Sequence, residues 1–197
     1  MRLFRTLPAF TLVLGACAST FSGAGQEFED TIAAPPQRVI QATATVFRDA
    51  AIPVGSVSPR ATFLHSEPFR VRRTWGADPV ESRLECGRDE LGEPLSGHLE
   101  VVVRIEAYAR PDRSREPVPN PTPAASSNFL LRVEATALDP RESNPDGTLE
   151  CTLTPTFRDA LLTAIRKAAM GEPVSAIPAS LASSITRRAV PSTTSSD

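Results

Sequence analysis

Two long runs of this sequence, residues 98–110 and 128–139, alternate apolar and polar side chains, and this pattern constrains the fold more than any other. Successive side chains of a β-strand point to opposite faces, so each run has one apolar and one polar face. One buried and one solvated face is typical of antiparallel sheets, and we expect the two runs to pair as a long antiparallel hairpin. The expected inward side chains are Leu99, Val101, Val103, Ile105 and Ala107 in the first run, and Phe129, Leu131, Val133, Ala135 and Ala137 in the second.

A helix is predicted before the hairpin, starting at Pro35-Pro36. Proline suits the first helical turn, because the N–H that it lacks would have no partner inside the helix. Ile52-Pro53 ends this segment, since proline cannot continue a helix. The side chains that fall on one helical face are those of Val39, Thr43, Val46, Phe47 and Ala50.

A second helix is predicted near the C-terminal end. Thr156 with Asp159 three residues later resembles a capping box, and Gly171 suits the helix end. Arg166 and Lys167 complement the helix dipole near that end. Its apolar stripe consists of Phe157, Leu161, Ile165 and Ala168.

Shorter strand-like runs complete the pattern. In the run 69–75 we expect Phe69, Val71, Arg73 and Trp75 to share one face, which makes Arg73 the visible candidate for a polar group inside the fold. The fold class is therefore α+β, with a curled antiparallel sheet of about five or six strands packed by an N-terminal and a C-terminal helix. The other short runs cover residues 27–33, 58–65, 84–86 and 149–153.

The N-terminal residues have the features of a secretory signal sequence. Arg2 and Arg5 precede an apolar stretch, residues 7–16, which is too short to span a bilayer. The motif Leu14-Gly15-Ala16-Cys17 then resembles the lipobox of bacterial lipoproteins, in which a branched apolar residue and two small residues precede the cysteine that is acylated. The resemblance implies a signal peptide over residues 1–16 and lipidation, palmitate included, at Cys17. An ordinary cleavage site with an incidental cysteine is the alternative.

Lipidation would place the chain at a membrane. Several acyl chains make a stable anchor. Removal of the signal peptide leaves 19 basic and 23 acidic residues, a net charge of −4, so attachment would depend on the acyl chains and not on charge. Ala18 follows the cysteine where an Asp would imply retention at the inner membrane. The resemblance thus implies an outer-membrane lipoprotein that faces the periplasm of the cell envelope.

The remaining chain divides by composition. Residues 17–26 are small and polar and suit a lipidated tether. Residues 27–170 form a single α+β domain, interrupted at 111–127 by a Pro-rich loop. Residues 171–197 are rich in Ser, Thr, Pro and Ala, and we expect a disordered tail.

Cys86 and Cys151 stand at matching inward positions of two predicted strands, in Leu-Glu-Cys-Gly and Leu-Glu-Cys-Thr. Export to an oxidising compartment favours a disulfide between them. Redox or metal chemistry is the competing interpretation, but the sequence holds no Cys-x-x-Cys.

The sequence holds no catalytic motif, so we expect a non-enzymatic protein without a cofactor or metal. His65 and His98 are the only histidines, and no zinc, phosphate-loop or hydrolase signature accompanies them. Asp89 and Glu90 are interpreted as solvating charges in a turn. A net charge of −2 gives no reason to expect a nucleic-acid partner. Arg70, Arg72 and Arg73 with Trp75 form either an exposed strand face, which we favour, or a cationic patch with an aromatic edge.

The order of elements over residues 27–170 resembles helix-grip domains and the BamC-like domains of outer-membrane lipoproteins. The resemblance lies in the pattern alone, and no site residue carries over. Two functions follow as hypotheses. In the first, the domain binds or scaffolds another component of the cell envelope through a sheet face or an edge strand. In the alternative, the sheet and closing helix enclose a cavity for a lipid or another hydrophobic ligand, as the helix-grip resemblance implies.

Overall fold

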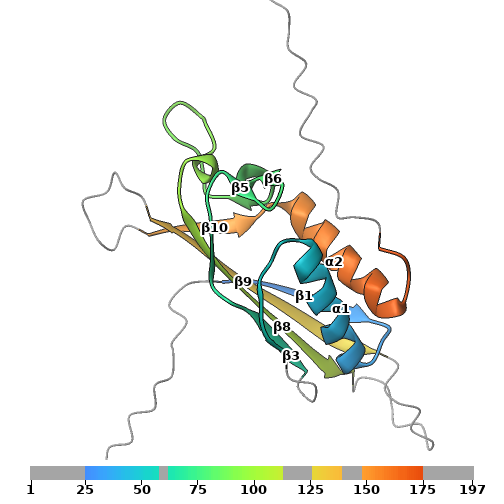
Figure 1. Cartoon of the computed structure of the whole chain (residues 1–197). Coiled ribbons are helices and arrows are strands. Elements are labelled where there is room, and N and C mark those ends of the chain that lie inside the picture. The colour runs from blue at the N-terminus through green and yellow to red at the C-terminus, as the bar shows by residue number, and fades with distance from the viewer. Residues whose placement is uncertain (1–24, 58–61, 113–125, 139–147, 175–197) are drawn as a thin grey trace, which may run out of the picture.

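The longest strands, β8 (Val101–Pro111) and β9 (Ser127–Leu138), pair in antiparallel register from Val101–Ala137 to Pro111–Ser127 and form the centre of the sheet. The predicted hairpin is therefore confirmed. The computed structural model describes residues 25–57, 62–112, 126–138 and 148–174 (Figure 1). The predicted signal peptide, Cys17, most of the Pro-rich loop and most of the C-terminal tail lie outside these residues.

Eight strands form one open antiparallel sheet. The strand order is β2-β3-β8-β9-β10-β7, while β1 adds a second partner to β9 and β4 adds a second partner to β8. A separate two-stranded ribbon consists of β5 and β6. The remaining strands are β1 (Gln26–Ile32), β2 (Val54–Val57), β3 (Phe63–Ser66), β4 (Phe69–Val71), β5 (Thr74–Trp75), β6 (Asp78–Pro79), β7 (Leu84–Glu85) and β10 (Thr148–Leu153).

Two helices lie side by side on one face of this sheet, as predicted (Figure 1). Helix α1 (Pro36–Asp49) begins directly after Pro35, and all five residues of its predicted apolar face are buried. Helix α2 (Pro155–Met170) ends at Gly171, whose left-handed φ of 81° is easy for glycine. The α+β class is thus confirmed. Neither helix is long and apolar enough to cross a bilayer.

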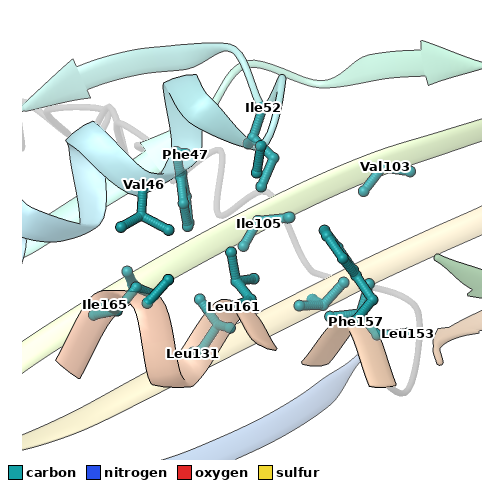
Figure 2. Close-up of a cluster of buried hydrophobic side chains, with 14 of the residues drawn as sticks. Val46, Phe47, Ile52, Val103, Ile105, Leu131, Leu153, Phe157, Leu161 and Ile165 are labelled. Carbon is teal, nitrogen blue, oxygen red and sulfur yellow. The ribbon is translucent and has the colours of Figure 1, made fainter. Parts of the chain in front are cut away.

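The layer between the helices and the sheet is filled with side chains (Figure 2). Phe47 of α1, Leu161 and Ile165 of α2, and Ile105 and Leu131 of the hairpin have no water-accessible surface. Such interiors pack like organic crystals and hold few voids larger than a water molecule. These residues therefore form a solid core and leave no room for a ligand among them.

The predicted strand 69–75 is confirmed only over β4, and its continuation to Trp75 on one face is wrong. The run 69–75 breaks at Arg73, which adopts a left-handed φ of 62° while the amide of Thr74 donates to the carbonyl of Arg72 at 2.7 Å. The turn lets the indole of Trp75 leave the sheet plane and meet the rings of Phe69 and Phe157 edge-on, with centroids 5.2 and 5.3 Å away. Arg73 itself is exposed, so it is not an inward polar group.

The N-terminal cap of α2 also differs from the prediction. Thr154, not Thr156, precedes the helix, and its Oγ1 accepts a hydrogen bond from the amide of Phe157 at 3.3 Å. Pro155 fills the first helical position, so the capping residue must stand one position earlier. The Oγ1 of Thr154 also donates to the carbonyl of Ser82 at 2.8 Å, which ties the start of α2 to a neighbouring turn.

The predicted disulfide between Cys86 and Cys151 is present. Leu84 pairs with Leu153 and Glu85 with Thr152, so the two cysteines follow directly in the same antiparallel register. Both are buried. The bond holds the short strand β7 against β10, where two residue pairs alone make a weak edge.

Replacing both cysteines, Cys86→Ser with Cys151→Ser, is expected to lower the free energy of unfolding by about 4 kcal/mol, because the bond closes a loop of 65 residues in the unfolded chain. Urea denaturation followed by circular dichroism measures the loss. The unsubstituted chain in the presence of a reductant is the matched comparison, since it breaks the same bond without changing the sequence. An unchanged unfolding midpoint in the double variant would contradict the structural role.

Candidate functional site

The sheet face that the helices leave uncovered, here called the outer face, carries the polar positions of the alternating strands. Register places Phe63, Tyr108 and Leu130 side by side across β3, β8 and β9. All three are half-buried, and the rings of Phe63 and Tyr108 lie 4.7 Å apart between centroids. We call these three residues the apolar row. Aromatic cross-strand pairs stabilise a sheet by up to about 1 kcal/mol, so the row also supports β3–β8 pairing.

A row of charged and polar side chains runs beside the apolar row. Its members in register are His65, Glu106, Arg132 and Glu27, from β3, β8, β9 and β1. The Nε of Arg132 lies 3.1 Å from a carboxylate oxygen of Glu27. The hydroxyl of Tyr108 donates to Glu106 at 2.9 Å and so joins the two rows. Charges of both signs therefore border the apolar row.

The outer face is hollowed where β1, β8 and β9 meet. The hollow is open to solvent and brings acidic side chains of β1 together with basic side chains of β8 and β9 around Tyr108 and Leu130. A concave surface on which several polar groups converge is a candidate binding site. Its lining residues are Glu27, Glu29, Asp30, Thr31, Tyr108, Arg110, Pro111, Asn128, Phe129, Leu130 and Arg132.

Strand β1 is held in place from the helix side. Arg166 of α2 donates to the carboxylate of Asp30 at 2.6 Å, and the guanidinium of Arg158 lies 5.6 Å from the ring centre of Phe28. The carboxylate of Asp30 also accepts from the amide of Thr31 at 2.8 Å. The acidic rim of the hollow is thus fixed to the core, although β1 lies at the edge of the sheet.

The structure places a buried charged group where the sequence did not predict one. Arg83 is buried, and its guanidinium donates to Asp78 at 2.6 Å and to the carbonyl of Ala50 at 2.7 Å. The same group lies 4.8 Å from the ring centre of Phe157 and 5.4 Å from that of Trp75. These contacts neutralise the charge and bind the segment 72–99 to α1 and α2. No local sequence pattern marks Arg83, because its partners come from three separate segments.

The other sequence candidates are separated by the fold. Arg70 is exposed and pairs with Glu100 at 2.6 Å, and Arg72 is exposed as well. Trp75 is buried, so the proposed cationic patch with an aromatic edge does not form. His65 lies on the outer face and His98 is exposed beyond a short helical turn. Within the described ranges, no three His, Cys, Asp or Glu side chains gather to hold a metal ion.

Comparison of the chain with protein-family models, with curated proteins and with solved structures finds no match. The resemblance to helix-grip and BamC-like domains therefore stays a resemblance of pattern.

Breaking the buried ion pair with Arg83→Leu is expected to lower the free energy of unfolding by about 3–5 kcal/mol, because Asp78 would remain as an unpaired buried charge. Arg70→Leu is the matched control. Its ion pair is exposed, with 74% and 46% of the two side chains accessible against 8% and 12% for the pair of Arg83, so its loss should stay below about 1 kcal/mol. If urea denaturation gave equal losses of unfolding free energy for Arg83→Leu and Arg70→Leu, the structural role of the buried ion pair would be contradicted.

The pKa of Tyr108 is raised above its ordinary value of 10.0, chiefly by burial and further by the hydrogen bond to Glu106. Since this is the chain's only tyrosine, its pKa is measured directly by following tyrosinate absorbance in an alkaline titration. We expect a native midpoint above that of the urea-unfolded chain. Protonated Tyr108 therefore contributes stability to the folded chain at pH values below the pKa of the unfolded chain. This contribution is lost as the pH rises through the pKa of Tyr108 in the folded chain.

Glu106→Gln should lower the native midpoint of Tyr108, because it removes the negative charge beside the phenol. Glu134→Gln removes a charge from the neighbouring strand β9 and serves as the control. A native midpoint equal to that of the unfolded chain would show that the hydroxyl is solvated like that of a free tyrosine.

Proposed function

We propose that this chain is a lipid-anchored, non-enzymatic protein of the bacterial cell envelope that docks another envelope protein on the outer face of its sheet. The observation that carries the docking proposal is the apolar row of Phe63, Tyr108 and Leu130, which lies on the face opposite the core. A sheet face that only meets water usually carries polar side chains, so an apolar row there favours a partner beyond its contribution to strand pairing. The anchoring part of the proposal is supported by the lipobox-like motif ending at Cys17.

The chemistry of the outer face favours a protein partner. A partner segment with apolar side chains would cover Tyr108 and Leu130, and polar groups of both signs would meet Glu27, Glu29 and Arg110. Interfaces of this kind have an apolar centre and a polar rim. A nucleic acid would need a basic surface.

The helix-grip alternative, a carrier of a hydrophobic ligand, finds no support in the packing. Such a ligand would lie between the sheet and the helices. There the described side chains of α1, α2, β8 and β9 fill the layer (Figure 2). We therefore do not propose it.

Anchoring is tested by metabolic labelling of the full chain with an alkyne palmitate analogue in a bacterium. We expect the label and the membrane fraction of the protein to depend on Cys17, and to disappear in Cys17→Ser. Ser19→Ala is the control close to the same site. Label that persists without Cys17 would overturn the anchoring proposal.

Docking is tested by chemical footprinting, because the chain has one tyrosine and one lysine. The rate of nitration measures the accessibility of Tyr108 on the outer face, and the rate of amine acetylation measures the accessibility of Lys167 on α2. We expect Tyr108 to react more slowly in intact cells than in the purified protein, while Lys167 reacts equally in both.

The variant Leu130→Arg should restore the reactivity of Tyr108 in cells, because a charge would replace the apolar centre of the docking surface. Thr163→Arg, at an exposed position of α2, is the control and should leave the protection intact. Equal nitration of Tyr108 in cells and in solution would overturn the docking proposal.

A further inference from the structure

A second feature of the surface lies apart from the outer face. Residues 87–94, here called the tip loop, connect β7 to the short helical turn at Leu95–Gly97 and project beyond β5 and β6 (Figure 1). Leu91 stands in this loop with 88% of its surface exposed. The other exposed large apolar residues of the described chain, Val102 and Met170, reach 36% and 37%.

A dense set of hydrogen bonds holds the tip loop. The carboxylate of Asp89 accepts from the amides of Leu91 and Glu93, both at 2.9 Å. The amide of Asp89 donates to Glu93, and the amide of Gly92 donates to Asp89, both at 3.0 Å. The guanidinium of Arg88 donates to the carbonyl of Gly92 at 2.7 Å. Asp89 is therefore an organising residue of the loop and not only a solvating charge.

The base of the tip loop is fixed as well. Gly87 accepts from the amide of Leu95 at 3.1 Å, and Cys86 is bonded to Cys151. Singly exposed apolar residues are common and need no explanation. Leu91 differs because its backbone is ordered before any partner arrives, and a pre-ordered loop loses less entropy on binding than a loose one.

The charge around Leu91 decides which partner suits it. Glu90 and Glu93 are exposed within the tip loop, Glu85 is exposed in the adjoining strand β7, and Arg88 directs its guanidinium to a carbonyl of the loop itself. Burial of one leucine contributes about 1.5–3 kcal/mol, which would add little to the attachment of a chain that acyl groups already anchor. An anionic lipid surface would in addition repel the three glutamates.

We propose that the tip loop inserts Leu91 into an apolar pocket of another protein, and that lysine or arginine side chains on the rim of that pocket pair with Glu90 and Glu93. An apolar anchor inside a charged rim is the arrangement that gives both affinity and specificity. This contact uses no residue of the outer face, so it stands or fails independently of the docking function proposed above.

The experiment is photo-crosslinking of the full chain in its host cell, with a benzophenone side chain introduced at position 91. The same group at position 170 is the control, because Met170 is an exposed apolar residue at the end of α2. We expect a protein adduct from position 91 that position 170 does not give. Mass spectrometry should map the adduct to a partner segment that contains Lys or Arg.

Charge reversal makes the test specific. In the presence of Glu90→Lys and Glu93→Lys, the yield of the adduct should fall about tenfold or more, because like charges would then face each other across the rim. Glu67→Lys with Glu172→Lys changes the net charge equally at exposed positions elsewhere and should leave the yield unchanged. The proposal would be overturned if position 91 gave no specific adduct or gave an adduct with phospholipid. It would also be overturned if the yield of the adduct were unchanged by Glu90→Lys with Glu93→Lys.

Discussion

The ladder between β8 and β9 is the constraint on which the rest of the structure depends. Its eleven residue pairs place every second side chain under the helices, among them Ile105 and Leu131. Because the side-chain period of a strand is two, a slip by one residue would bring the polar positions into the core. All other strands of the main sheet, except β2 and β7, pair directly with one of these two. The ladder therefore determines both the core and the outer face.

The end of the sheet beyond Val101 depends on a different kind of interaction. There the chain from 72 to 99 has only very short strands, and ladder hydrogen bonds alone would not hold it. The disulfide joins it to β10, and the guanidinium of Arg83 joins it to α1 and to the ring of Phe157. These contacts make the segment a rigid base for the tip loop. A surface loop can present an apolar side chain in one orientation only when its base is rigid in this way.

Several features were predictable because they are local or periodic. Alternation predicted β8, β9 and their buried faces, and the 3.6-residue period predicted the buried face of α1. The two cysteines were paired correctly because their strands share one local sequence, Leu-Glu-Cys. The turn at Arg73 was missed, since arginine is an unusual residue for a positive φ and the surrounding pattern continues as a strand. Asp89 and Glu90 of the tip loop were predicted only to be solvating charges in a turn, because the hydrogen bonds that Asp89 accepts depend on the folded backbone of the loop.

The sequence by itself thus determined the two helices, the two long strands with their buried faces, the disulfide and the motif that resembles a lipobox, since each of these rests on residues close together in the chain or on a repeated spacing. Only the tertiary structure decided that Arg83 is buried, that Arg73 is exposed, and that Tyr108 and Leu130 share a hollow with Glu27. The physical reason is that these properties depend on which distant segments meet. Coulomb interactions, burial and curvature act through space, whereas periodicity acts along the chain.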